Sequence, residues 1–115
     1  MLHKSMEAAD LLAKEGISAE VLDPRTLQPL DEDLIFSSVR KTNRLVIVEE
    51  SWDFASVGAQ ISDRVQRECF DHLDAPIERV NTEFVHFPYN EAQEEFILPK
   101  PSGIVEAVKK TMYIN

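Results

Sequence analysis

The sequence predicts an α/β fold in which helices cover both faces of a mostly parallel sheet. The strongest indication is residues 45–48, four consecutive apolar residues of which three are β-branched, as expected of a strand buried on both faces. After an acidic turn, apolar residues recur every four positions between residues 57 and 69, which is the spacing of one helix face. Predicted helices and strands alternate along the chain, and this order is typical of parallel sheets with right-handed crossovers.

Two helices and one strand are predicted for the N-terminal half. Apolar residues at helical spacing indicate a helix that begins near Leu2 and ends before Gly16, where glycine relieves a left-handed turn. Residues 17–22 alternate between apolar and polar, which predicts a strand with one buried face. Asp31 is a good N-cap for a helix over residues 32–41, because its carboxylate can accept a hydrogen bond from a free backbone N–H.

The C-terminal half continues the alternation with shorter elements. A predicted helix over residues 57–72 is followed by a short strand over residues 77–80. Residues 81–90 are irregular and unusually aromatic, and residues 91–96 are expected to form a short helix. Ser102 is expected to cap a last helix near the C-terminus.

All 115 residues are expected to form one domain, and that domain is expected to lack its first strand. The reason is that the opening helix has no strand before it, which leaves only three strands in the predicted sheet. A strand just upstream of Met1 would complete the sheet. We therefore expect a three-layer α/β/α domain that is cut from a longer chain.

The composition limits the classes of partner. The formal net charge of −9 disfavours nucleic acids and anionic membranes and favours a basic protein partner. No apolar run approaches the roughly 20 residues that a membrane-spanning helix needs. Cys69 is the only cysteine, which excludes a disulfide within the chain and indicates a reducing compartment.

Glu49 and Glu50 are the most conspicuous candidates for chemistry, because they directly follow the central strand. Carboxylate pairs that cleave glycosidic bonds converge on one substrate across roughly 5–9 Å. Adjacent residues of a strand start toward opposite faces, so capping, ion pairing or an interface is favoured over acid–base catalysis. Gly58, near the start of the next helix, could let an anion or another backbone approach, although tight packing of helix against sheet is the simpler explanation.

No catalytic, cofactor-binding or metal-binding set is predicted within the chain. The histidines at positions 3, 72 and 86 lie far apart and share no metal-ligand spacing. Cys69 continues an apolar helix face, as expected of a buried and inert thiol. Only three glycines are present, which is too few for a glycine-rich phosphate loop.

The aromatic segment has two possible roles. Phe84, Phe87 and Tyr89 lie close together on a stretch with no helical or strand period. Such side chains either fill the core of their own domain or dock onto a partner surface, and the sequence leaves both roles open.

Five segments together resemble one known family. They occur in the order DPRTLQPLD (23–31), RLVIVEESW (44–52), VGAQI (57–61), LDAPIERV (73–80) and FPYN (87–90). The set is similar to the C-terminal domain of the β subunit of thiamine-diphosphate-dependent 2-oxo acid dehydrogenases (E1 β), and most similar to the pyruvate dehydrogenase members. The first three segments also occur in transketolase-like C-terminal domains, whereas LDAP with the FPY loop is more specific to E1 β.

The resemblance implies a transketolase-like α/β/α fold with a strand before the first helix and a preceding pyrimidine-binding domain. It implies that thiamine diphosphate and magnesium are held by other parts of an α2β2 enzyme. The parent enzyme would decarboxylate pyruvate oxidatively and transfer the acetyl group to lipoyl groups of the E2 component, in the mitochondrial matrix or the bacterial cytoplasm. No catalytic residue of the family falls within these 115 positions, so the fragment alone is expected to be inactive.

An assembly role also follows from the resemblance. The implied partners are the E1 α subunit, a second E1 β subunit and the small, basic peripheral subunit-binding domain of E2. Asp74 and the terminal carboxylate at Asn115 correspond to groups that hold this E2 domain. Contacts with neighbouring domains and subunits are expected at Glu49, Glu50, Trp52, Gly58, Phe87 and Tyr89.

Three alternatives remain open at this point. The first is that the parent enzyme is a branched-chain 2-oxo acid dehydrogenase or an acetoin dehydrogenase. A free-standing flavodoxin-like signalling domain would need an acidic pair after its first strand and a lysine after its last, whereas Glu49 and Glu50 follow a middle strand. A small enzyme that uses these two glutamates is the third.

Overall fold

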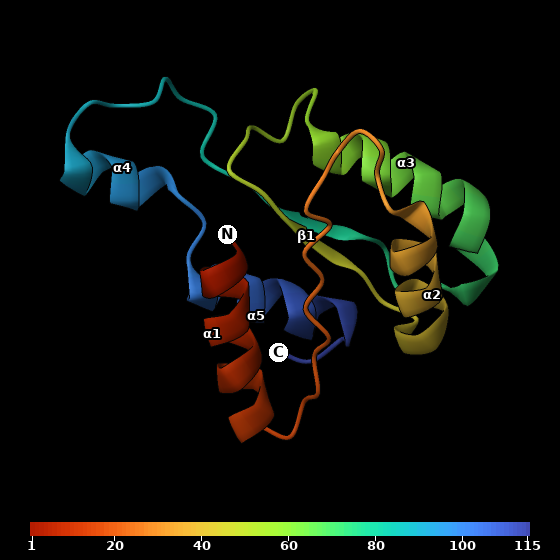
Figure 1. The fold of residues 1–115 in the computed structure, drawn as a ribbon. Coiled ribbons are helices and arrows are strands. Elements are labelled where there is room, and N and C mark those ends of the chain that lie inside the picture. Colours follow the sequence, from red (N-terminus) through yellow and green to blue (C-terminus); the bar gives the residue numbers. More distant parts are fainter.

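The computed structural model describes all of residues 1–115 and places helices on both faces of a small parallel sheet (Figure 1). None of its helices is long and apolar enough to cross a bilayer. In chain order the elements are α1 (Leu2–Lys14), α2 (Glu32–Thr42), β1 (Val46–Val48), α3 (Val57–Cys69), the 3-10 turn η1 (Phe70–His72), β2 (Glu78–Val80), α4 (Glu91–Ile97) and α5 (Pro101–Thr111).

The sheet consists of β1 and β2, which run parallel. Val46 lies opposite Glu78, and Val48 lies opposite Val80. The two strands are joined by α3, so this part of the chain is a strand–helix–strand unit of the kind that the alternating pattern predicted.

α3 and α5 cover opposite faces of the sheet. Glu78 of β2 accepts a 2.9 Å hydrogen bond from Lys110 of α5, which places α5 on one face. Ile47 of β1 points to the other face, where its side chain lies close to Gly58 of α3. Because α1 packs against α5 and α2 packs against α3, the molecule has the three layers that the sequence predicted (Figure 1).

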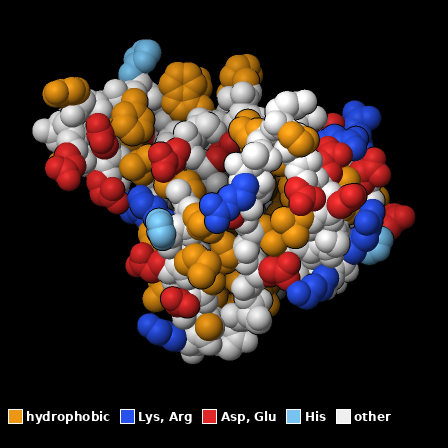
Figure 2. All heavy atoms as spheres, viewed as in Figure 1, with side chains coloured by type: hydrophobic (Ala, Val, Ile, Leu, Met, Phe, Trp, Pro, Cys, Tyr) orange, Lys and Arg blue, Asp and Glu red, His pale blue; other side chains and the backbone are white.

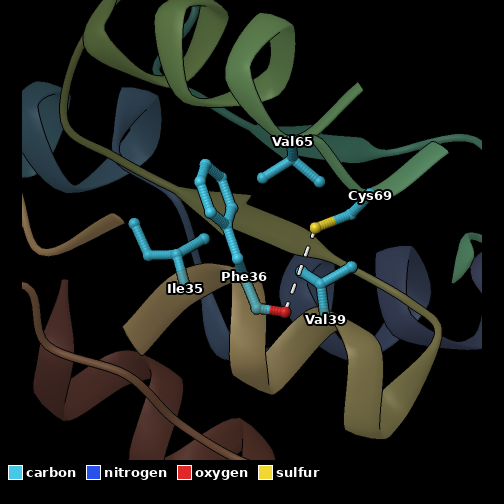
Figure 3. Packing of buried hydrophobic residues seen from close by; sticks show 5 residues of the cluster. All are labelled: Ile35, Phe36, Val39, Val65 and Cys69. Carbon is cyan, nitrogen blue, oxygen red and sulfur yellow. Dashed lines mark hydrogen bonds between the residues drawn. The ribbon is translucent and has the colours of Figure 1, made fainter. Parts of the chain in front are cut away.

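The main apolar core lies between α2 and α3 (Figure 3). Leu45 and Ile77, which flank the starts of the two strands, pack against this core and connect it to the sheet. Cys69 is buried as expected, with its sulfur 3.9 Å from the carbonyl oxygen of Phe36. The buried members of the cluster are Ile35, Phe36, Val39, Val65 and Cys69.

Most predicted helix ends are confirmed. Gly16 has a φ of +81°, the left-handed conformation that ends α1. Asp31 accepts a 3.0 Å hydrogen bond from the N–H of Leu34 and thereby caps α2. Asn43 ends the same helix with a φ of 63°. The helix predicted over residues 57–72 is present as α3 followed by η1.

The strand predicted over residues 17–22 does not form, so the sheet has two strands rather than three. None of residues 18–23 makes a backbone–backbone hydrogen bond, although Glu20 forms an ion pair with Lys41 of α2 at 2.6 Å. Alternating polarity predicts that one face is buried, but a strand also requires a neighbouring edge in register. The structure offers this segment no such edge.

The predicted cap of the last helix is also wrong. α5 begins at Pro101, so Ser102 lies inside the helix, and the N-cap residue Lys100 makes no side-chain cap. Proline is favourable at the first helical position, because its φ is already suitable and its missing N–H would have no intrahelical partner there.

Candidate functional site

Glu49 joins the end of β1 to the start of α3. Its carboxylate accepts hydrogen bonds from the N–H of Gly58, at 3.0 and 3.1 Å, and from the side-chain amide of Asn81, at 3.0 Å. Gly58 lies in the first turn of α3, where backbone N–H groups are free and the helix dipole favours an anion. We call Glu49, Gly58 and Asn81 the Glu49 corner.

The Glu49 corner has no room for a side chain at position 58. A Cβ on Gly58 would overlap the carboxylate oxygen of Glu49 and lie 3.1 Å from Cγ2 of Ile47. The anion that approaches Gly58 is therefore a carboxylate of the same chain. Close approach and tight packing, which the sequence offered as separate explanations, are both present.

The surroundings of Glu49 favour its charged form. Burial raises the pKa of Glu49, but hydrogen bonds from Ser56, Asn81 and the Gly58 N–H outweigh burial and hold the pKa below its ordinary value of 4.5. Two other polar atoms near this corner, Oγ of Ser51 and Oδ1 of Asn81, are buried without a hydrogen-bond partner.

Stability is therefore expected to depend on the charge of Glu49. Because the folded-state pKa is depressed, this contribution is present above about pH 4.5 and is lost as pH falls through the folded-state pKa. Urea denaturation at a series of pH values should show a smaller loss of stability on acidification for Glu49→Gln than for the parent chain. Identical pH profiles would contradict this assignment, since the remaining carboxylates are common to both proteins.

Glu50 has different surroundings. Its side chain is 52% exposed and lies 3.7 Å from the backbone amine of Met1. The two neighbouring glutamates thus have separate partners, one at the start of α3 and the other at the start of α1.

Trp52 connects the loop after β1 to the aromatic segment after β2. Its indole N–H donates a 3.0 Å hydrogen bond to the carbonyl of Val85, and its ring lies 4.7 Å from that of Phe84 at an angle of 60°. Phe87 is 59% exposed and Tyr89 is fully exposed, so these rings do not fill the core.

Large apolar side chains gather on this side of the molecule. Figure 2 shows many of them along its upper edge, over the loops that follow β1 and β2. Beside α4 the surface has an open hollow of about 450 Å³, which includes His86 and Phe96 in its lining. We call the exposed set the aromatic surface: Trp52, Phe54, Phe84, Val85, Phe87, Tyr89 and Phe96.

Asp74 lies near the C-terminal end of α5. The Arg44 guanidinium lies 3.8 Å from the Asp74 carboxylate and donates a 3.0 Å hydrogen bond to the carbonyl of Thr111. The hydroxyl of Tyr113 donates a 3.3 Å hydrogen bond to the carbonyl of Asp74. The fold thus brings Asp74 to the last turn of the chain, and the exposed terminal residue Asn115 follows two positions after Tyr113.

Thiamine diphosphate with magnesium does not fit the residues of this chain. No group of three or more His, Cys, Asp or Glu in the structure could hold a metal ion. The carboxylate of Glu49, which lies at the sheet end where ligands commonly bind, is already engaged by Gly58 and Asn81.

Sequence reasoning missed Asn81 and Arg44. Asn81 directly follows β2 just as Glu49 directly follows β1, and the carboxyl ends of parallel strands meet at one edge of a sheet. This shared position could have predicted from the sequence that Asn81 lies beside Glu49. Arg44 had no comparable signal, since its contacts with Asp74 and Thr111 join residues 30 or more positions apart.

Comparison with known proteins places these features in a family. The family model of the transketolase C-terminal domain matches residues 1–104. The chain is 51% identical over 111 residues to the pyruvate dehydrogenase E1 component subunit beta of Rickettsia felis. The aligned region covers 96% of this chain and 34% of that protein. The mitochondrial pyruvate dehydrogenase E1 component subunit beta of Dictyostelium discoideum is 46% identical, covering 96% of this chain and 31% of that protein.

Two further matches widen the comparison. The acetoin:2,6-dichlorophenolindophenol oxidoreductase subunit beta of Bacillus subtilis is 45% identical over 104 residues, covering 90% of this chain and 30% of that protein. A solved structure described as "Split gene transketolase, inactive beta4 tetramer" superposes with a TM-score of 0.81 at 29% identity, covering 98% of this chain and 35% of that one. The chain thus spans about a third of the length of these relatives.

Proposed function

Because the chain belongs to the transketolase C-terminal domain family, we propose that it is the C-terminal domain of a 2-oxo acid dehydrogenase E1 β subunit. The observation that carries this proposal is the 51% identity to a pyruvate dehydrogenase β subunit across almost the whole chain. The parent enzyme in this proposal is a thiamine-diphosphate- and magnesium-dependent pyruvate dehydrogenase of the mitochondrial matrix or bacterial cytoplasm. Its relatives come from bacteria and from a mitochondrion, which supports both locations.

The proposed role of this domain is assembly rather than catalysis. The aromatic surface supports this role, because Phe54, Phe84 and Tyr89 are large side chains left exposed, and groups of exposed apolar side chains mark interaction sites. Its occupants in this proposal are the rest of the β subunit, the E1 α subunit and a second β subunit. The hydrogen bond between Glu49 and Gly58 stabilises part of this surface, because it joins the two ends of the loop that carries Trp52.

The second proposed role is docking of the E2 peripheral subunit-binding domain at Asp74 and the carboxylate of Asn115. Asp74 is 58% exposed at its side chain and lies close to the C-terminal residues, which is the placement that this role requires. Partner arginines or lysines would bind these carboxylates through charge-assisted hydrogen bonds. The net charge of −9 would also raise the association rate at low ionic strength.

A chimeric β subunit tests both roles. In it, these 115 residues replace the corresponding C-terminal third of the Rickettsia felis subunit, which is co-expressed with the E1 α subunit of that organism. We expect an α2β2 tetramer that binds the E2 domain, with affinity about tenfold weaker for Asp74→Ala and weaker in high salt.

Asp71→Ala is the matched control, because Asp71 is an exposed acid in the adjacent η1 turn. Failure of the chimera to form a tetramer would contradict the assembly role. Binding that is equally weakened by Asp71→Ala and Asp74→Ala would contradict specific docking at Asp74.

An acetoin-cleaving enzyme is the second candidate for the parent, because the Bacillus subtilis relative is nearly as similar as the others. Turnover of pyruvate against acetoin by the complete parent enzyme distinguishes the two. The signalling-domain alternative requires an acidic pair at one site, whereas the Glu49 carboxylate bonds to Gly58 at the start of α3 and Glu50 lies beside the backbone amine of Met1. We do not propose it.

A further inference from the structure

The hollow beside α4 is the part of the aromatic surface that can receive a side chain. Its volume of about 450 Å³ falls within the range of pockets that hold small molecules, and Pro88 and Phe96 are among the residues that line it. The N–H of Glu83 donates a 3.2 Å hydrogen bond to the carbonyl of Ile97, which is buried at the end of α4. This bond joins the aromatic segment to α4, so the hollow is formed in the chain without a partner.

Acidic side chains without an ion pair lie around the hollow. Glu91 and Glu94 flank two residues of α4 that line it, and Glu83 lies at the bond to Ile97. None of the three carboxylates has a basic group within 4 Å. Figure 2 shows acidic side chains beside apolar ones at the α4 end of the molecule. We call Glu83, Glu91 and Glu94 the acidic rim.

The exposed rings are extensive enough for a stable interface. Phe54, Phe84, Phe87, Tyr89 and Phe96 are each at least 59% exposed. At about 200 Å² for each ring, they present roughly 700 Å² of aromatic area. One partner in an interface of standard size contributes about 800 Å².

The charge of this surface selects the kind of partner. Two copies of the chain would bring their acidic rims together, and each copy carries a net charge of −9, so pairing of like charges disfavours a second copy. A basic partner would instead neutralise the rim. Lys100 already lies 5.6 Å from the centre of the Phe96 ring, which shows that a cation can pack on this surface.

We propose that the hollow receives one large apolar side chain from a basic amphipathic helix of another protein chain, and that lysines or arginines of this helix pair with the acidic rim. The proposal rests on the proposed assembly role and specifies the chemistry of the occupant. A helix is favoured over an extended strand because the surface presents side chains from a loop and a short helix, rather than a row of backbone groups in strand register.

Selection from a peptide library on the complete 115-residue chain tests this proposal. The phage-displayed library keeps an amphipathic helical pattern, omits tryptophan and allows Lys, Arg, Glu, Asp or Gln at each polar position. We expect the selected peptides to carry net positive charge. Trp52, the only tryptophan of the chain, lies on the aromatic surface, so its fluorescence reports binding of each synthetic peptide.

Glu91→Lys is expected to weaken binding of the selected peptides by at least about fivefold, because it replaces an attraction with a repulsion. Asp33→Lys is the matched control, since Asp33 is also an exposed acid without an ion pair in the first turn of a helix, α2, and its replacement changes the net charge equally. This control is expected to bind within about twofold of the parent chain. Alanine in place of the large apolar side chain of the peptide is expected to cost about tenfold in affinity.

Selected peptides that are neutral or acidic, or no enrichment at all, would overturn the proposal. Equal weakening by Glu91→Lys and Asp33→Lys would also overturn it, because binding would then follow net charge alone. A Trp52 emission shift that grows with the concentration of the chain by itself would assign the surface to a second copy instead. The assembly role is judged separately by tetramer formation of the chimeric subunit, so it can hold where the basic helix fails.

Discussion

Gly58→Ala is expected to lower the free energy of unfolding by about 1–3 kcal/mol, measured by urea denaturation. The added Cβ would overlap the Glu49 carboxylate and crowd Ile47. Glu49 is also held by Asn81, and Ile47 is held in β1, so neither neighbour can move without losing contacts. Displacing Glu49 would also leave the first turn of α3 without its anionic partner.

Gly103→Ala is the matched control for this prediction. Gly103 lies in α5, and nothing lies within 4 Å of the position that its Cβ would take. Alanine is favoured over glycine in a helix by about 1 kcal/mol, so this variant is expected to be at least as stable as the parent chain. Equal stability of the two variants would show that the close approach at Gly58 does not constrain the corner.

The Glu49 corner shows what local sequence patterns can and cannot reveal. A buried apolar run followed by Glu49, and a helix that begins near Gly58, were both predictable from hydrophobic spacing. Their contact was not, because it depends on how the intervening loop returns the helix start to the strand end. Among the structural roles that the sequence favoured for Glu49, the structure shows capping, because its carboxylate accepts a hydrogen bond from the N–H of Gly58 at the start of the next helix.

The same difference between local patterns and contacts of distant residues explains which of the other predictions were confirmed. The ends of α1 and α2 were predictable because Gly16 and Asp31 act on their immediate neighbours. The strand over residues 17–22 depends on a partner edge that no local pattern can supply. The aromatic segment was ambiguous for a related reason, since the exposure of Phe87 and Tyr89 is decided by the packing of distant elements.

Phe36→Ala is expected to have the largest effect on stability, a loss of about 3–5 kcal/mol in the free energy of unfolding. Phe36 is 8% exposed, and its ring lies in the cluster that joins α2 to α3 (Figure 3). The sheet has only two strands of three residues each, so helix packing supplies much of the apolar burial. Urea denaturation followed by far-UV circular dichroism measures this loss.

Phe54→Ala provides the comparison, because it removes the same side chain from a position that is 76% exposed. Its expected effect on the free energy of unfolding is within about 0.5 kcal/mol. A loss for Phe36→Ala no larger than that for Phe54→Ala would mean that the α2–α3 core does not hold this fold together. A much larger loss for Phe36→Ala than for Phe54→Ala would show that the two side chains have different roles. Phe36 stabilises the domain, and Phe54 remains available for the proposed contacts of the aromatic surface.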